Sequence, residues 1–133
     1  MIYLLDTHAF IWAILKTDNL SKNSREIISS GKNQVYVSTL SFWEISLKTK
    51  IGKFIFENID IKDFPQYAKQ MDFSIIGLQE NESISFHELP IKKNHKDPFD
   101  RMLIWQAICR DMTIISKDDL FEQYKIDGLR LIW

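Results

Sequence analysis

The stretch that decides the fold is Ile2-Tyr3-Leu4-Leu5-Asp6-Thr7-His8. Its four leading residues have strand character, and an apolar run of this length predicts a strand that is buried on both faces, as parallel strands are. Asp6 then stands where the strand ends. Ligands of open α/β sheets bind just beyond the carboxyl ends of the strands, so Asp6 is the first candidate for a functional site.

The overall composition predicts one globular domain over residues 1–133. Of the 133 residues, 45% are hydrophobic and 26% are charged, and the formal net charge is -1, so no global basic surface points to nucleic acid. No apolar run is long enough for a membrane span and no leader segment is evident, which favours a cytoplasmic location without membrane contact. The single cysteine, Cys109, falls in an apolar helical segment and is expected to be a small core residue.

Strand-like and helix-like segments alternate along the chain. This alternation predicts the α/β class, as a three-layer α/β/α sandwich around a mostly parallel five-stranded sheet. The predicted strands cover 2–6, 34–38, 73–77, 113–116 and 129–133. The predicted helices cover 8–16, the segment between Ser21 and Gly31, 41–51 with Thr39 or Ser41 as cap, 61–71, 79–89, 97–110 and 118–124.

Two acids follow predicted buried strands directly. Asp6 follows the first strand, and Asp118 follows Thr113-Ile114-Ile115-Ser116. Each has a purely structural alternative as the N-cap of the next helix, a position that aspartate favours. Parallel strands end at one edge of a sheet, so the two carboxylates are expected to converge there.

Three further acids lie on predicted helices. Glu44 can form an exposed pair with Lys48, but its apolar neighbours argue that the helix is largely covered. Asp97 precedes a proline and is a good N-cap, with an assisting role at a site as the alternative. Asp100 shares a face with the apolar stripe of its helix, where a carboxylate needs a partner such as a cation.

Converging carboxylates cannot all stay ionised without a cation. Hard oxygen ligands favour Mg²⁺ or Mn²⁺, and His8, His87 and His95 do not follow the spacing of zinc ligands. The sequence therefore predicts that Asp6, Glu44, Asp100 and Asp118 hold one or two such ions.

Several short stretches, spread over nearly the whole chain, occur in an order that is specific to one known family. They are Leu4-Leu5-Asp6-Thr7-His8, Val37-Ser38, Trp43-Glu44-Ile45, Gly52-Lys53, Asp97-Pro98-Phe99-Asp100-Arg101, Leu103-Ile104 and Ser116-Lys117-Asp118. With these stretches the chain resembles a PIN-domain ribonuclease of the VapC toxin type. It departs from the family at Trp105, where a small residue is usual, and at Ser116, where threonine is usual.

The resemblance implies a parallel five-stranded α/β/α fold, a Mg²⁺ or Mn²⁺ site, RNA cleavage and neutralisation by an antitoxin. Similar proteins are commonly homodimers. Carried over residue by residue, the site acids are Asp6, Glu44, Asp100 and Asp118, and Thr7 and Ser38 match positions that assist.

The resulting hypothesis is a toxin of a toxin–antitoxin pair that hydrolyses RNA with metal-activated water. Basic residues around the acids would contact RNA phosphates, and the candidates are Lys48, Lys53, Lys96 and Arg101, with His95 in the same basic segment. The main alternative is a catalytically silent PIN-like module that docks RNA or a protein partner. A phosphoacceptor resembling response regulators is less consistent with the sequence, because Leu5 and Thr7 flank Asp6 in place of a second acid.

Overall fold

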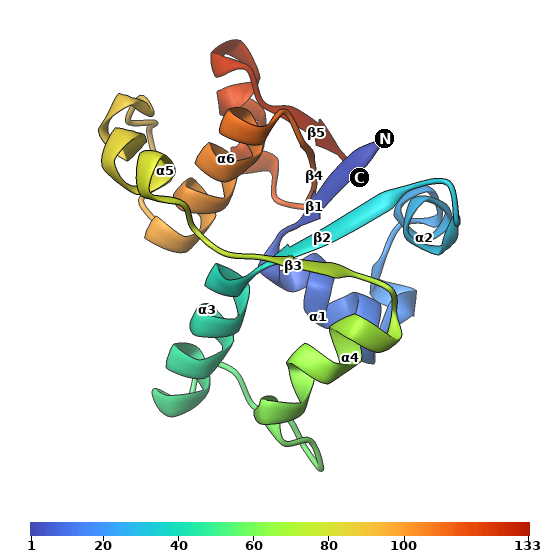
Figure 1. The fold of residues 1–133 in the computed structure, drawn as a ribbon. Coiled ribbons are helices and arrows are strands. Elements are labelled where there is room, and N and C mark those ends of the chain that lie inside the picture. The colour runs from blue at the N-terminus through green and yellow to red at the C-terminus, as the bar shows by residue number, and fades with distance from the viewer.

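A single parallel sheet organises the molecule. The computed structural model describes residues 1–133 and orders the strands β3-β2-β1-β4-β5, with every neighbouring pair parallel (Figure 1). The strands are β1 (Ile2–Leu5), β2 (Gln34–Ser38), β3 (Ser74–Ile76), β4 (Thr113–Ile115) and β5 (Arg130–Ile132). The predicted α/β class and five-stranded sheet are confirmed, and the sheet is parallel throughout.

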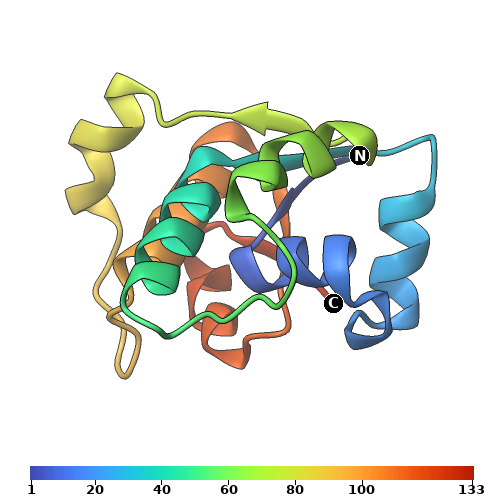
Figure 2. The same ribbon diagram turned by 90° about the horizontal axis from the view of Figure 1, so that it is seen from below.

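Helices cover both faces of this sheet. Figure 1 shows α5 and α6 on one face and α1, α2 and α4 on the other, and Figure 2 shows the same layers from below. No helix is long and apolar enough to cross a membrane. The α-helices are α1 (Thr7–Leu15), α2 (Lys22–Ser29), α3 (Thr39–Lys50), α4 (Phe64–Gln70), α5 (Glu80–Ser85) and α6 (Pro98–Arg110), and the 3₁₀ segments are η1 (Thr17–Asn19), η2 (Ile61–Asp63), η3 (Phe86–Glu88) and η4 (Asp119–Asp127).

Alternate residues of the central strand β1 enter different layers of the core. Tyr3 and Leu5 join the cluster that α1 and α4 cover, whereas Leu4 joins the cluster under α6. Both clusters are buried, so the strand is apolar on both faces. This explains why the sequence shows an unbroken apolar run up to Asp6.

The predicted element boundaries needed two corrections. The third helix begins at Thr39, because Ser38 accepts a hydrogen bond from Leu40 N at 3.2 Å and caps it. The predicted cap at Thr39 or Ser41 was therefore wrong. The predicted helices 61–71 and 79–89 are partly 3₁₀, at 61–63 and 86–88, and the predicted helix 118–124 is 3₁₀ as part of η4.

The expectation that Cys109 is a core residue was also wrong. Its side chain is exposed, because the buried stripe of α6 is formed by Leu103, Ile104 and Ala107 on a different side of the helix. Trp105, also on α6, is half-buried and donates from Nε1 to Ser85 Oγ at 3.1 Å. The indole of Trp105 thus bonds to α5 and also packs against the core cluster under α6.

Candidate functional site

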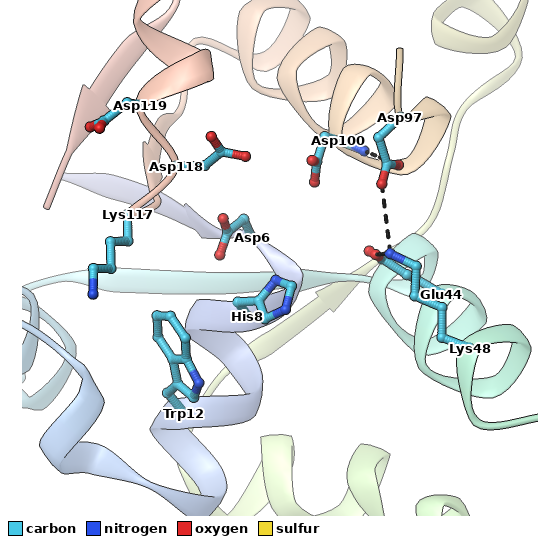
Figure 3. Close-up of a pocket in the computed structure, with 10 residues that line it drawn as sticks. All are labelled: Asp6, His8, Trp12, Glu44, Lys48, Asp97, Asp100, Lys117, Asp118 and Asp119. Carbon is cyan, nitrogen blue, oxygen red and sulfur yellow. Dashed lines mark hydrogen bonds and ion pairs between the residues drawn. The ribbon is translucent and has the colours of Figure 1, made fainter. Parts of the chain in front are cut away.

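A pocket of about 510 Å³ opens at the carboxyl ends of the central strands (Figure 3). Carboxylates dominate its wall, together with two lysines, one histidine and one tryptophan. Its lining residues are Asp6, His8, Trp12, Glu44, Lys48, Asp97, Asp100, Lys117, Asp118 and Asp119. All four carboxylates predicted to hold a metal therefore line the same pocket.

The topology of the sheet creates this pocket. β1 lies between β2 and β4, and the chain leaves β1 toward β2 but leaves β4 toward β5. The connections diverge between β1 and β4, which is the place where open parallel sheets bind ligands. Asp6 follows β1 and Asp118 lies three residues beyond the end of β4, so both carboxylates face this crevice.

Asp6 is held rigidly at the floor of the pocket. Its Oδ1 accepts a hydrogen bond from Ala9 N at 2.8 Å, which caps α1, and its Oδ2 accepts one from Ser116 Oγ at 2.5 Å. Burial raises the pKa of Asp6 to about 6, although these two hydrogen bonds oppose the shift. The structural and functional alternatives for Asp6 are therefore compatible, since one oxygen caps a helix while the carboxylate borders the pocket.

Asp118 has the same double arrangement. Its Oδ1 accepts from Leu120 N at 2.9 Å and caps η4, and its own N–H donates to Ser116 Oγ at 3.1 Å. Ser116 thus links the two acids that follow β1 and β4. The hydroxyl of Ser116 makes both contacts, and a threonine at this position would carry the same hydroxyl.

Glu44 is buried on α3 rather than exposed. Thr7 Oγ1 donates to Glu44 Oε1 at 2.5 Å and is also hydrogen-bonded to Ser41 Oγ at 3.0 Å. The other carboxylate oxygen, Oε2, pairs with the Lys48 ammonium one turn later. The predicted pair with Lys48 exists, but inside the pocket, where it compensates the buried charge.

The two acids of α6 have different environments. Asp97 Oδ1 accepts from Phe99 N at 2.8 Å and Asp100 N at 3.3 Å, which makes Asp97 the N-cap, and its Oδ2 lies 3.6 Å from Lys48 Nζ. Asp100 accepts no such backbone bond and points into the pocket. Burial is the largest cause that raises the pKa of Asp100 to about 8, and the other carboxylates add to the shift: Asp97, Asp6, Glu44 and Asp118.

A model of the PIN domain matches residues 3–127 of the sequence. The chain belongs to the PIN-domain family. No curated protein matched the chain in a sequence comparison.

Solved structures share the fold of this PIN domain at low sequence identity. VapBC2 from Rickettsia felis, solved bound to a DNA fragment from its promoter, is 21% identical, with a TM-score of 0.60 over 99% of this chain and 98% of that chain. VapBC-1 from nontypeable Haemophilus influenzae is 17% identical, with a TM-score of 0.60 over 99% and 97%. A domain of a protein of unknown function from Methanocaldococcus jannaschii is 13% identical, with a TM-score of 0.58 over 99% and 89%.

Of the residues predicted to assist, Thr7, Ser38 and Asp97, only Asp97 lines the pocket of this PIN domain. Thr7 is buried and orients Glu44 through the hydrogen bond from its hydroxyl. Ser38 is buried as the cap of α3 and does not line the pocket. Its contribution is to fix the start of the helix that carries Glu44.

The predicted RNA-contacting residues divide into three groups. Lys53 and Lys96 are exposed, and Lys48 lies in the pocket with its ammonium between two carboxylates. Arg101, also predicted to contact RNA, has a different environment. Its buried guanidinium donates to Pro90 O at 2.9 Å, Leu89 O at 3.2 Å and the Tyr124 hydroxyl at 3.1 Å, so it is a structural residue.

Sequence reasoning also missed residues at this site. Lys117 and His8 line the pocket, and each is adjacent to or near a predicted site acid in sequence, which could have indicated them. His95 was grouped with exposed basic residues, but it is buried, and its Nε2 lies 3.5 Å from Asp100 Oδ2. Only the folded loop places His95 there, so no local signal pointed to it.

Proposed function

We propose that this PIN domain is a Mg²⁺- or Mn²⁺-dependent ribonuclease and the toxin of a toxin–antitoxin pair. One observation carries the proposal: carboxylates from four separate parts of the chain meet in one pocket. Asp6 comes from the end of β1, Glu44 from α3, Asp100 from α6, and Asp118 from the start of η4. A merely structural use of each acid does not require them to converge.

The donor set of the pocket fits a hard divalent cation. All four proposed ligands, Asp6, Glu44, Asp100 and Asp118, offer carboxylate oxygens, and no cysteine lines the pocket. Burial, with neighbouring carboxylates adding to it, raises the pKa of Asp6 and Asp100, so their ionised forms are costly in the protein alone. A bound Mg²⁺ or Mn²⁺ would relieve this cost and favour the ionised carboxylates.

The residues around these acids would hold them ready for an ion. Ser116 and the N-terminus of α1 fix Asp6, and Thr7 with Lys48 fixes Glu44. Such hydrogen bonds orient ligands before the ion arrives. When bound, the cation would lower the pKa of a water molecule and stabilise negative charge at a phosphodiester.

RNA binding needs positive charge near this acidic pocket. Lys117 lines the pocket and is itself exposed, and Lys53 and Lys96 are exposed outside it. Ammonium groups at these positions would attract the phosphate backbone without reading its sequence. We therefore assign Lys53, Lys96 and Lys117 as candidate RNA contacts and leave Arg101 out.

The proposed protein partner is an antitoxin. Two structures that share the fold over nearly the whole chain are of VapBC proteins. We extend the pairing to this chain on that basis, together with the PIN-family match.

The test is RNA cleavage by purified protein with and without Mn²⁺. Wild type should cleave RNA only when the metal is present, and Asp6→Asn should lose at least about 100-fold in rate, a loss typical when one preorganised charge-stabilising group is removed. Asparagine keeps the oxygen that caps α1, so the circular dichroism spectrum should not change. Asp18→Asn removes an exposed acid far from the pocket and serves as the matched control.

Metal binding by wild type without any cleavage would favour the silent binding module. The toxin role has its own arm: expression of wild type should arrest growth, whereas Asp6→Asn should not, and the cognate antitoxin should restore growth. Normal growth with abundant soluble wild type would contradict the toxin role and leave the nuclease to the cleavage assay.

A further inference from the structure

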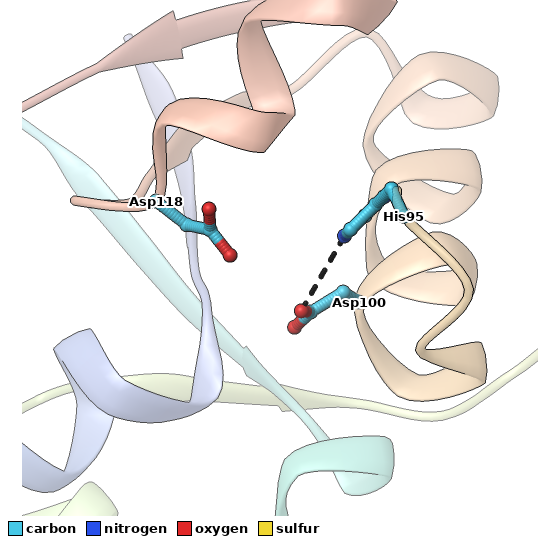
Figure 4. Close-up of side chains that lie close together, drawn as sticks. All are labelled: His95, Asp100 and Asp118. Atoms are coloured by element: carbon cyan, nitrogen blue, oxygen red, sulfur yellow. Dashed lines mark ion pairs between the residues drawn. The ribbon is translucent and has the colours of Figure 1, made fainter. Parts of the chain in front are cut away.

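One buried histidine beside Asp100 has a ring nitrogen without a hydrogen-bond partner. His95 lies in the loop before α6 and is 3% exposed. Its Nδ1 is 2.7 Å from the Tyr124 hydroxyl, whereas its Nε2 has no hydrogen-bond partner. Figure 4 shows that the ring points toward Asp100 and Asp118, and Nε2 lies 3.5 Å from Asp100 Oδ2.

Two opposite roles are open to a nitrogen in this position. If Nε2 carries no proton, its lone pair can bind a cation together with Asp100 and Asp118. If Nε2 carries the proton, it is a donor to a carboxylate and cannot be a ligand. Which role His95 takes depends on which ring nitrogen of the neutral side chain carries the proton. The hydrogen bond of Nδ1, the nitrogen with a fixed partner, determines this.

The hydrogen bonds of the Tyr124 hydroxyl determine which tautomer His95 adopts. Arg101 Nη1 lies 3.1 Å from the Tyr124 hydroxyl, and a guanidinium can only donate, so the tyrosine oxygen accepts. The single hydroxyl proton of Tyr124 then needs an acceptor in a fully buried site, and His95 Nδ1 at 2.7 Å is its remaining partner. Nδ1 is therefore the unprotonated nitrogen and Nε2 carries the hydrogen.

We propose that Arg101 and Tyr124 hold His95 as the Nε2–H tautomer, so that His95 positions Asp100 by donating to its Oδ2 and is not a metal ligand. The proposal rests on the proposed function only in treating Asp100 as a ligand. The present 3.5 Å separation would need to shorten by about 0.5 Å to reach the usual N–H···O range.

As a consequence, the two carboxylate oxygens of Asp100 would have different partners. One of its oxygens receives the histidine N–H, which leaves the other for the cation, and carboxylate ligands are commonly oriented by such a second bond. The cation would then meet oxygen ligands only. An all-oxygen set suits Mg²⁺ and Mn²⁺ and does not add the imidazole nitrogen that favours zinc.

The first test reads the tautomer directly in metal-free protein. Long-range ¹H–¹⁵N correlation spectra of ¹⁵N-histidine protein at pH 8 in EDTA should show His95 with a protonated Nε2 and an unprotonated Nδ1. His8 and His87 are exposed, so His8→Gln and His87→Gln identify the His95 signals by difference. Tyr124→Phe removes the hydroxyl donor and should allow some Nδ1–H form. A protonated Nδ1 in wild type, alone or with Nε2, overturns the proposal.

The second test uses bound Mn²⁺ as the probe. Electron spin echo spectra of the Mn²⁺ complex of His8→Gln, which lacks the other imidazole near the acids, should show no coupling to imidazole ¹⁴N, and such coupling would overturn the proposal. His95→Leu should weaken Mn²⁺ binding about 10-fold or more, as for other residues that orient ligands, while His95→Gln keeps an N–H donor and should lose less. An equal loss in both variants would mean that His95 only fills space and would also overturn the proposal. If wild type binds no Mn²⁺, the proposed function fails, while the tautomer is still decided by the metal-free spectra.

Discussion

Asp97 and Asp100 lie within one turn of α6, but their carboxylates serve different purposes. Asp97 accepts backbone hydrogen bonds from Phe99 and Asp100, so its role is already satisfied within the helix. Asp100 faces other carboxylates and the unpartnered nitrogen of His95. Asp97 therefore contributes mainly to the stability of the helix, whereas Asp100 belongs to the candidate metal site.

This difference predicts opposite effects of substitution. Asp97→Ala should lower the free energy of unfolding by about 1 kcal/mol because a helix cap is lost, and Asp97→Asn should restore most of it. Asp100→Asn should leave the metal-free stability at pH 8 unchanged or higher, since it removes a repelled charge, and should shrink the rise in melting temperature that Mn²⁺ gives. The measurement is thermal melting with and without Mn²⁺. If Asp100→Asn keeps the full rise in melting temperature with Mn²⁺ and Asp97→Asn loses it, the metal ligand is Asp97 and not Asp100.

At the scale of elements, Arg101 ties α6 to two segments distant in sequence. Its guanidinium donates to the carbonyls of Leu89 and Pro90 in the loop after η3, and to Tyr124 in η4. These bonds fix the loop that carries His95 against the side of the acid pocket. The arginine of the Asp97–Arg101 stretch therefore builds the site without touching a substrate.

Replacing this arginine should cost stability rather than RNA affinity. Arg101→Lys keeps the charge but leaves buried oxygens unpaired, each worth about 1–3 kcal/mol, so we expect a loss of at least about 2 kcal/mol in urea denaturation. Lys96→Ala, at an exposed position on the same loop, should change stability by no more than about 0.5 kcal/mol. Normal stability of Arg101→Lys combined with weakened RNA binding would restore the RNA contact that the sequence suggested.

At the scale of the whole molecule, folding itself brings like charges together. The connections that follow β1 and β4 diverge at the centre of the sheet, and helices α3 and α6 add their acids to the same crevice. The native state therefore carries an electrostatic cost that a cation can remove.

This cost predicts how stability depends on pH. The pKa of Asp100 rises from 3.8 to about 8 on folding, so the folded state holds a proton that the unfolded state has lost. The resulting destabilisation grows as pH rises from about 4 and is complete above about 8. The free energy of unfolding of metal-free protein should therefore fall between pH 6.5 and 8, by on the order of 1 kcal/mol per pH unit.

Urea denaturation in EDTA across this range is the measurement. The lowered pKa of His95 reduces stability only below pH 6.5, the ordinary pKa of histidine. The pKa of Asp6 is about 6, so most of its effect on stability is complete at pH 6.5. The range from pH 6.5 to 8 therefore reports mainly on Asp100. Asp100→Asn should flatten the profile, and saturating Mn²⁺ should flatten or reverse it, since metal binding needs the ionised form. A wild-type profile that rises with pH in EDTA would contradict the raised pKa.

The sequence by itself determined the features that depend on local pattern. The unbroken apolar runs predicted buried parallel strands, the alternation with helical segments predicted the α/β fold, and the positions of Asp6 and Asp118 after strands predicted where the site lies. Caps such as Asp6 and Asp97 were also predictable, because they satisfy backbone groups a few residues away. The order of the motifs further indicated the family.

Only the tertiary structure decided which side chains meet. The burial of Arg101 and His95, the exposure of Cys109 and the contact of Ser116 with Asp6 depend on segments far apart in sequence. Whether a charged or polar group faces water or another group is set by what packs over it, and that packing follows from the strand order rather than from neighbours along the chain. The carboxylates could therefore be listed from the sequence, but the network that holds them required the fold.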